Sequence, residues 1–433
     1  STSRGLGDVY KRQKYCRSGV LFFVMRPKSS NFAKKFQTSS DVTMRTSNIS
    51  GKVYYIGVND RTTSRFEGLW PLPLGVSYNS YLVDGGDKVA IIDGVEVSHA
   101  LRQIDHIKSI LGDRQPDYMV INHMEPDHSG AIRMLRQAFP GLTIVGNTQT
   151  LGMVRGFYGV DDNTLTVKDG ETLDLGGATL RFALTPMVHW PETMMTYLEE
   201  EHTLFSGDAF GCFGALNGAV MDTGMDTARY FPEMVRYYSN IVGKYGKFVQ
   251  KALKKLESFE ISTICPTHGP VWREKTAEVI DIYDRLSRYE PLDDGVTIVY
   301  GSMYGNTEQM AEAAADGLAA AGVRDISVLN ASNTDLSYII ADIFRHRGLV
   351  IAAPTYSDGL FPPVAAVMEA IAVRGVQNRE VLLLGSHTWS QQAIKVMTAH
   401  IEASGLSTVA DAVSAKHAPA PDVLTQCRQS GSL

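Results

Sequence analysis

The stretch INHMEPDHSG, residues 121–130, places two histidines and two carboxylates within six residues, directly after an apolar run. The four side chains are His123, Glu125, Asp127 and His128. Loops that follow buried strands present such side chains at one edge of a sheet, where they can converge on a ligand. The stretch therefore predicts a metal site at a strand end.

Three further candidate ligands follow apolar runs in the same way. His189 comes after LRFALTPMV, Asp208 after TLFSG and His268 after ISTICPT. Four imidazoles and three carboxylates are more than one ion needs, whereas two metal ions about 3.5–4 Å apart would use all of them, with one carboxylate as a bridge. Asp208 suits the bridge, because it arrives alone on its own turn.

These residues resemble the ligands of the metallo-β-lactamase superfamily, which uses a His-x-His-x-Asp-His loop and later His, Asp and His on an αββα sandwich to hold zinc. This chain has Glu125 where the loop has its second histidine. The change replaces a nitrogen ligand by a hard anionic oxygen, and mixed histidine–carboxylate sites suit iron or manganese. The pattern His-x-Glu-x-Asp-His is similar to that of the flavodiiron proteins within the superfamily.

The resemblance implies two iron ions, each with three terminal ligands and one shared carboxylate. In some members the histidine equivalent to His128 points away from the metal, so the role of this residue stays open. The implied ligands of the first iron are His123, Glu125 and His189, those of the second are Asp127, His128 and His268, and the bridge is Asp208.

The second half of the chain contains a candidate phosphate loop in IVYGSMYGNTEQMA, residues 298–311. A strand ends at Gly301, and a loop of small and hydroxyl-bearing residues precedes a helix, whose first N–H groups favour a phosphate. The loop has no Lys or Arg, so it is not a Walker A motif. Ordinary helix capping is the alternative.

Two later loops favour a flavin. APTYSDGLFPP (353–363) and GSHTWSQQA (385–393) each follow an apolar strand and reach the carboxyl edge, where doubly wound sheets bind ligands. Together the three loops resemble those of flavodoxin, an FMN-binding electron carrier, with Tyr356 and Trp389 as candidates to flank the isoalloxazine ring. The implied FMN contacts are Ser302, Met303, Tyr304, Gly305, Asn306, Thr307, Pro354, Thr355, Tyr356, Ser357, Gly359, Ser386, His387, Thr388 and Trp389.

A polar break in the stretch RYEPLDDGV, residues 288–296, divides the chain. After it, strands alternate with helices, which is typical of a parallel, doubly wound sheet. The expected fold class is therefore α/β, a metallo-β-lactamase-like αββα sandwich followed by a flavodoxin-like sheet. The expected segments are a basic leader at 1–43 that is artefactual or disordered, a di-iron domain at 44–292, an FMN domain at 293–416 and a frayed tail at 417–433.

Composition argues against several classes of partner. The net charge of −6 disfavours nucleic acid, and the longest apolar run near the start, residues 20–25, is far too short to span a membrane. The four cysteines are scattered without a Cys-x-x-Cys pair, which excludes a rubredoxin-type iron site and fits a reducing compartment. We therefore expect a cytoplasmic protein without a nucleic-acid or membrane partner.

The resemblance implies an oxidoreductase that reduces O₂ to water, NO to N₂O, or both, with electrons reaching the di-iron centre through FMN. It implies the short class without a fused rubredoxin, an external donor such as rubredoxin, and a head-to-tail homodimer or a dimer of such dimers. The sequence does not choose between O₂ and NO. Two alternatives stay open: a zinc hydrolase with an accessory flavodoxin-like domain, and an electron-transfer flavoprotein with a vestigial metal loop.

Overall fold

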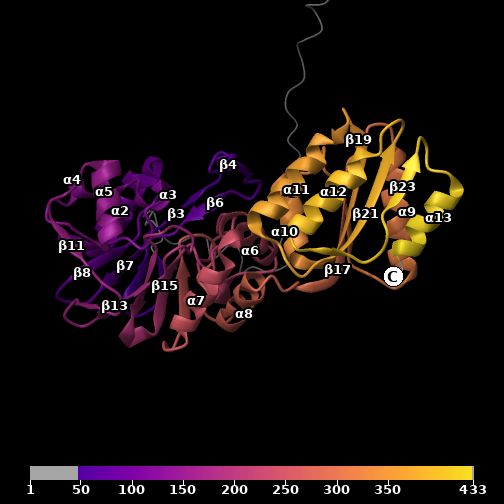
Figure 1. The fold of residues 1–433 in the computed structure, drawn as a ribbon. Helices are drawn as coiled ribbons and strands as arrows, with labels where there is room; N and C mark the ends of the chain where they lie inside the picture. Colours follow the sequence, from indigo (N-terminus) through magenta and orange to yellow (C-terminus); the bar gives the residue numbers. More distant parts are fainter. Residues whose placement is uncertain (1–46, 432–433) are drawn as a thin grey trace, which may run out of the picture. The chain divides into compact units, whose positions relative to one another are not determined.

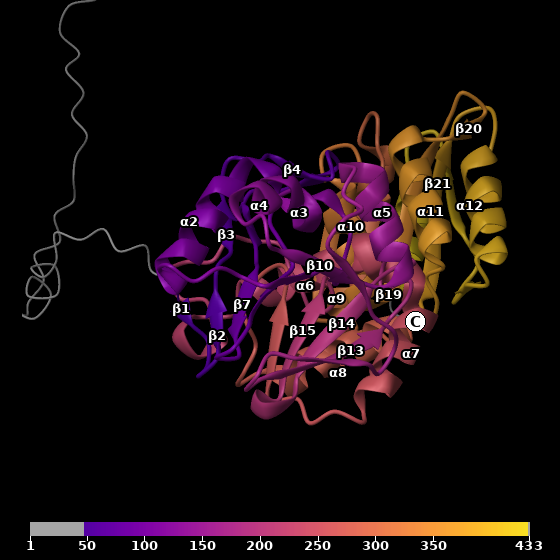
Figure 2. The ribbon, with the colours of Figure 1, turned by 90° about the vertical axis from the view of Figure 1, so that its left-hand side faces the viewer.

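Two β-sheets that lie face to face form the first half of the described chain (Figures 1 and 2). The structure, a computed structural model, describes residues 47–431, and the leader predicted at 1–43 lies outside them. The first sheet has the order β1 (Ser47–Asn48), β2 (Val53–Tyr55), β7 (Tyr81–Asp84), β8 (Val89–Ile92), β9 (Tyr118–Val120), β10 (Thr143–Gly146) and β11 (Thr164–Thr166). The second has the order β12 (Thr172–Asp174), β13 (Thr179–Leu184), β14 (Met194–Leu198), β15 (Thr203–Gly207) and β16 (Thr263–Pro266).

Helices cover the outer faces of these sheets (Figure 1). In α2 the buried side chains Ala100, Ile104, Ile107 and Leu111 recur at helical spacing and form one apolar face. The α-helices of this half are α2 (Ala100–Leu111), α3 (Pro126–Ser129), α4 (Ile132–Ala138), α5 (Thr148–Tyr158), α6 (Tyr230–Tyr237), α7 (Gly246–Leu256) and α8 (Thr276–Ser287). Within residues 47–431, no helix combines the length and the apolar character that a membrane crossing requires.

Short elements fill the connections of the first half. The stretch DGGD, residues 84–87, joins β7 and β8 as an antiparallel pair. The other short elements are the strand pairs β3 (Val58–Asp60) with β6 (Val76–Tyr78) and β4 (Arg65–Phe66) with β5 (Trp70–Pro71), and the helical turns η1 (Val97–His99), η2 (Glu199–Glu201), η3 (Asp222–Gly224), η4 (Tyr238–Val242) and η5 (Gly243–Tyr245).

The helical segment between β15 and β16 is not continuous. The chain forms α6, a wide turn in η4, a tight turn in η5 and then α7. A Cβ at Gly246 would lie 2.4 Å from the carbonyl oxygen of Ser287, so only glycine permits this close approach of α7 to the end of α8. The glycines of the sequence GKYG, residues 243–246, mark the break.

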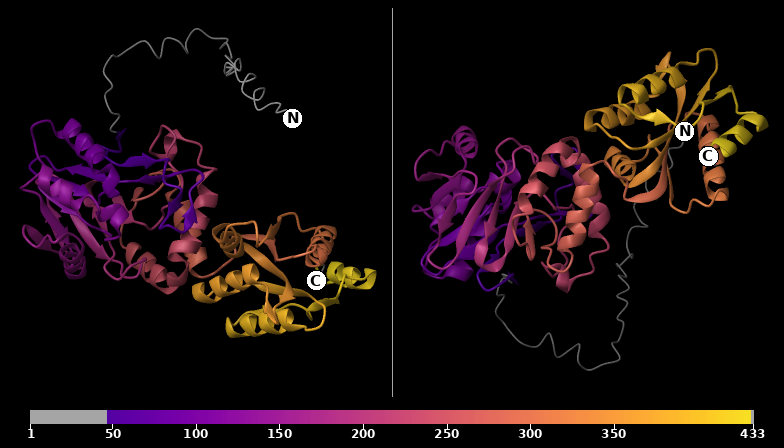
Figure 3. Two further views of the ribbon diagram at one scale, coloured as in Figure 1. Left: turned by 90° about the horizontal axis from the view of Figure 1, so that it is seen from above. Right: turned by 60° about the horizontal axis from the view of Figure 1, so that its bottom comes forward.

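A parallel sheet flanked by helices forms the second half (Figures 1 and 3). Side chains alternate along its strands: Ile298 packs on one face, against α9, and Val299 on the other. The main strands are β18 (Ile326–Asn330), β17 (Asp293–Tyr300), β19 (His346–Tyr356), β21 (Glu380–His387), β22 (Ser407–Thr408) and β23 (Val413–Lys416), and β20 (Gly359–Leu360) folds back on β19. The helices are α9 (Asn306–Ala320), α10 (Leu336–Arg345), α11 (Pro362–Arg374), α12 (Gln392–Ala403) and α13 (Pro421–Gly431).

The end of the chain differs from the frayed tail that the sequence predicts after Lys416. Residues 421–431 form α13, which packs along α9 (Figures 1 and 3). The Cys427 side chain is fully buried in this contact, and a Cβ at Gly317 of α9 would lie 2.0 Å from the carbonyl oxygen of Arg428. Small residues on α9 therefore let the last helix approach closely. The domain boundary at 292/293 stays a prediction.

Candidate metal centre and flavin pocket

The seven predicted metal ligands all lie just beyond the ends of strands in the first half. The strand β9 leads into the first four, whereas β13, β15 and β16 each lead into one of the others. Because these strands end close together, the structure places the side chains around one buried volume. In chain order they are His123, Glu125, Asp127, His128, His189, Asp208 and His268.

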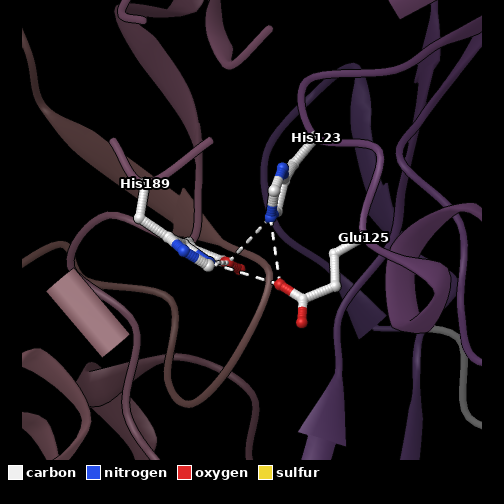
Figure 4. A group of neighbouring side chains, drawn as sticks. His123, Glu125 and His189 are labelled. Carbon is white, nitrogen blue, oxygen red and sulfur yellow. Dashed lines mark hydrogen bonds and ion pairs between the residues drawn. The ribbon is translucent and has the colours of Figure 1, made fainter. Parts of the chain in front are cut away.

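The first group consists of His123, Glu125, His189 and Asp208, all buried, each with one ligand atom within 4.8 Å of the others. Nε2 of His189 lies 3.2 Å from Oε2 of Glu125 and 3.2 Å from Oδ2 of Asp208. Nε2 of His123 lies 3.2 Å from Oε2 of Glu125. Both rings point toward the Glu125 carboxylate, although they come from different loops (Figure 4).

The second group consists of Asp127, His128 and His268. Nε2 of His128 and Nε2 of His268 lie 3.4 and 3.3 Å from Oδ2 of Asp127. Nε2 of His128 also lies 2.9 Å from Oδ1 of Asp208, so the His128 ring points into the site. Asp208 thus directs Oδ2 at the first group and Oδ1 at the second, which is the arrangement of a bridging carboxylate.

Hydrogen bonds from outside the cluster fix two of the rings. Nδ1 of His123 lies 2.9 Å from a carboxylate oxygen of Glu192, and Nδ1 of His268 lies 2.7 Å from the carbonyl oxygen of Ser77. Donation from Nδ1–H in each ring leaves the Nε2 lone pair facing inward, as a metal requires. Thr267 donates its hydroxyl to Asp208 at 2.6 Å. Glu192 is not among the residues predicted from the sequence, although it lies in the segment HWPETM that begins at His189.

The site concentrates negative charge beside imidazoles. Burial opposes ionisation, yet His128 and His123 hold the pKa of Asp208 well below its usual range. Hydrogen bonds from the imidazoles likewise outweigh burial and lower the pKa of Glu125. Despite the burial of His128, Asp127 and Asp208 raise its pKa to about 9. The carboxylates therefore remain anionic and favour positive charge between them.

Buried polar atoms without a hydrogen-bond partner show that the site fits a pair of cations. In the described chain, both carboxylate oxygens of Asp127 and Nε2 of His268 are buried without a hydrogen-bond partner. Buried polar atoms are rarely left unpaired, because each costs free energy. Two converging groups of nitrogen and oxygen atoms, joined by one carboxylate, suit two ions of the iron or manganese type.

A pocket of about 420 Å³ opens beside the cluster and is walled in part by Glu125 and Asp127. Phe66 forms part of its wall and packs edge-on against the His268 ring, with 5.2 Å between ring centroids. Glu67 is exposed overall but also lines the pocket, where partial desolvation of its carboxyl and the charge of Glu125 raise its pKa to about 7. The volume suits a small molecule that approaches both groups.

A second pocket, of about 400 Å³, lies at the carboxyl edge of the parallel sheet, where the three flavin-type loops meet. Most of the predicted contacts line it, and Trp389 and Tyr304 are each 88% exposed at its rim. Large exposed aromatic side chains beside a polar cleft fit a flat, aromatic ligand. The predicted contacts that line it are Met303, Tyr304, Asn306, Pro354, Thr355, Tyr356, Ser357, Ser386, His387, Thr388 and Trp389.

Four predicted flavin contacts, Ser302, Gly305, Thr307 and Gly359, are not among the residues that line this pocket. Ser302 and Thr307 instead shape the loops: Ser302 accepts a hydrogen bond from the Gly305 N–H at 3.0 Å, and Thr307 bonds to Ser386 at 2.8 Å. Three further residues line the pocket without having been predicted from the sequence, namely Asp358, Ser390 and His417.

Comparison with known proteins agrees with both sites. Two family models match, one described as ODP family beta lactamase over residues 76–269 and the other as flavodoxin over residues 298–431. An anaerobic nitric oxide reductase flavorubredoxin of Escherichia coli is 30% identical over 389 residues, which cover 88% of this chain and 80% of that protein. The chain belongs to the flavodiiron protein family.

Solved flavodiiron structures share the fold. The flavodiiron protein of Giardia intestinalis has a TM-score of 0.85 at 27% identity and covers 91% of this chain and 96% of its own. The rubredoxin oxygen:oxidoreductase of Desulfovibrio gigas has a TM-score of 0.84 at 27% identity, with 89% and 97% covered. Membership in this family confirms the predicted fold class, makes the chain an oxidoreductase and disfavours the zinc hydrolase.

Proposed function

We propose that this flavodiiron protein reduces O₂ to water, NO to N₂O, or both, at a di-iron centre that receives its electrons through FMN. The observation that supports the proposal most is the position of Asp208 between the two ligand groups. Its Oδ2 faces the group that contains Glu125, and its Oδ1 faces the other group. The relatives support both substrates, because one is named as a nitric oxide reductase and another as a rubredoxin oxygen:oxidoreductase.

Each ligand then has one task. When bound, the iron pair supplies the redox chemistry at the gas molecule, and FMN supplies the electrons. Asp208 would bind one ion through each of its two oxygens and so set the separation of the pair. The proposed ligands of one iron are His123, Glu125 and His189, and those of the other are Asp127, His128 and His268.

The surrounding residues keep this geometry in place. Glu192 and the Ser77 carbonyl hold the Nδ1 protons of His123 and His268, so that both rings stay in the tautomer with a free Nε2. Phe66 and Tyr237 pack against the His268 ring, at 5.2 and 5.5 Å between centroids, and exclude water from that side. The pocket at Glu125 and Asp127 admits a small gas molecule.

The second half binds FMN in the pocket at its carboxyl edge. The first turn of α9 would hold the phosphate, and Tyr356 and Trp389 would flank the ring. The electron donor is external and is best represented by rubredoxin, which the name of the Desulfovibrio gigas relative contains. A head-to-tail homodimer in the cytoplasm completes the proposal, because it brings the FMN of one subunit beside the irons of the other.

Consumption of each gas by the purified, iron- and FMN-loaded protein, in buffer freed of oxygen beforehand, tests this function. Reduced rubredoxin is the donor, and O₂ and NO are supplied in separate runs. We expect turnover of at least one gas, and no turnover after Glu125→Ala substitution. Equal consumption by wild type and Glu125→Ala would instead support the electron-transfer flavoprotein whose metal loop is vestigial.

A further inference from the structure

A second cluster of potential metal ligands lies at the opposite edge of the parallel sheet from the flavin pocket. Asp293 begins β17, Asp325 directly precedes β18 and His346 begins β19. Parallel strands align their amino ends, and Asp293 pairs with His346 in the sheet. One ligand atom from each of the three residues lies within 4.8 Å of the other two. Asp293 lies in the polar break at residues 288–296, which the proposed function does not use.

His346 is the buried member of the cluster, with 0% of its surface exposed. Its Nδ1 lies 2.9 Å from the Thr297 hydroxyl oxygen. Its Nε2 has no hydrogen-bond partner among residues 47–431 and lies 3.4 Å from Oδ2 of Asp325. When Nδ1–H donates to Thr297, the Nε2 lone pair faces a carboxylate oxygen, an arrangement that a cation between the two atoms stabilises.

The backbone of β17 passes close to the His346 ring. A Cβ at Gly295 would lie 2.8 Å from Nε2 of His346, so the glycine of the sequence DDG lets the backbone pass the ring edge.

The two carboxylates share one arginine. Arg345 donates from Nε to Oδ2 of Asp293 at 2.6 Å and from its terminal nitrogen to Oδ2 of Asp325. Arg347 is paired with Asp294 at 2.8 Å and does not neutralise the cluster. The Asp293 and Asp325 side chains are 46% and 45% exposed, so an ion from solvent reaches them without unfolding the sheet.

We propose that His346, Asp325 and Asp293 bind a divalent transition-metal ion, for which Zn²⁺ serves as the probe. One imidazole and two carboxylates are a donor set that suits a transition metal better than magnesium or calcium, which prefer oxygen alone. The ion competes with Arg345 for the carboxylates. It ties the first residue of β17 to the starts of β18 and β19, and is therefore a structural site, separate from the di-iron centre.

Zinc content of the holoenzyme tests the proposal directly. Protein that already carries iron and FMN is incubated with Zn²⁺ in slight excess, passed through a desalting column and analysed by elemental mass spectrometry. We expect one additional zinc per chain in the wild type and none after His346→Gln or Asp325→Asn, with iron and FMN unchanged. The matched control is Asp162→Asn, which removes another arginine-paired aspartate and leaves zinc binding intact.

Arg345→Gln separates the metal site from a simple ion-pair cluster. Removal of the competing guanidinium frees both carboxylates, so zinc should bind at least as tightly as in the wild type. The wild type should also melt several degrees higher in the presence of zinc, and Asp325→Asn should not. Equal zinc content in the wild type, His346→Gln and Asp325→Asn would overturn the proposal, as would loss of zinc in Arg345→Gln.

Discussion

At the scale of single residues, Glu125 determines which metal the centre prefers, iron or zinc. It supplies an oxygen to the first group through the atom that also approaches His189, at 3.2 Å. We predict that Glu125→His, which restores the ligand pattern of the zinc enzymes, lowers iron content and raises zinc content at the centre. Gas turnover should fall by more than the roughly 10- to 100-fold effect that outer hydrogen bonds typically have on metal sites. Elemental analysis with turnover measures both, and a variant that keeps its iron and its activity would contradict the role of Glu125.

Glu192 should matter through His123. It accepts the Nδ1 proton of His123 at 2.9 Å and also binds the Met124 N–H at 2.9 Å. Glu192→Gln removes the negative charge and keeps the size, so we expect roughly 10- to 100-fold weaker iron retention or activity. Iron loss during dialysis against a chelator gives the measurement. Glu171→Gln, at an exposed carboxylate remote from the cluster, is the control.

The sequence predicts direct ligands better than their supports. His123 and Asp208 follow apolar strands, so position along the chain is enough to find them. Glu192 and the Ser77 carbonyl depend on the path of turns and hairpins, which hydrophobic periodicity does not encode. Hydrophobic pattern also does not show which apolar residues are buried. Leu101 continues the apolar pattern of α2, but it lies at the edge of the buried face and is 66% exposed.

At the scale of elements, the hydrophobic pattern of the sequence predicts the strands of the sheets well. It predicts poorly where helices begin and end. The break between α6 and α7 and the formation of α13 both depend on glycines that let one helix approach another backbone. Such contacts join residues far apart in the sequence, at Gly246 with Ser287 and at Gly317 with Arg428, so a local pattern cannot show them.

Two helical glycines give opposite predictions. A Cβ at Gly317 of α9 would lie 2.0 Å from the Arg428 carbonyl oxygen, whereas a Cβ at Gly152 of α5 meets nothing within 4 Å. Gly317→Ala should therefore lower the free energy of unfolding by about 1–3 kcal/mol. Gly152→Ala should raise it by up to about 1 kcal/mol, because alanine favours the helix. Thermal melting measures both, and stabilisation by Gly317→Ala would contradict the packing of α13 on α9.

At the scale of the whole molecule, the proposed dimer makes electron transfer occur between subunits. One variant, Glu125→Ala, lacks a working metal centre and keeps its FMN. Another, Asn306→Asp, places a negative charge in the first turn of α9, where the FMN phosphate is expected, and keeps its iron. Each variant alone should be inactive with rubredoxin as donor.

Mixing the two variants under conditions that exchange subunits should restore activity. Half of the dimers then pair a working FMN with the irons of the other subunit, and each has one active pair, so about a quarter of wild-type turnover is expected. A mixture that stays inactive although mixed dimers form would show that electrons pass within one chain and would contradict the head-to-tail arrangement.

Iron content and iron spectroscopy of freshly isolated protein test the central claim most directly. We predict two iron ions per chain that form a coupled pair by Mössbauer spectroscopy, together with one FMN. Two zinc ions in their place, with iron absent and the metal centre colourless, would contradict the assignment of this site as a redox centre.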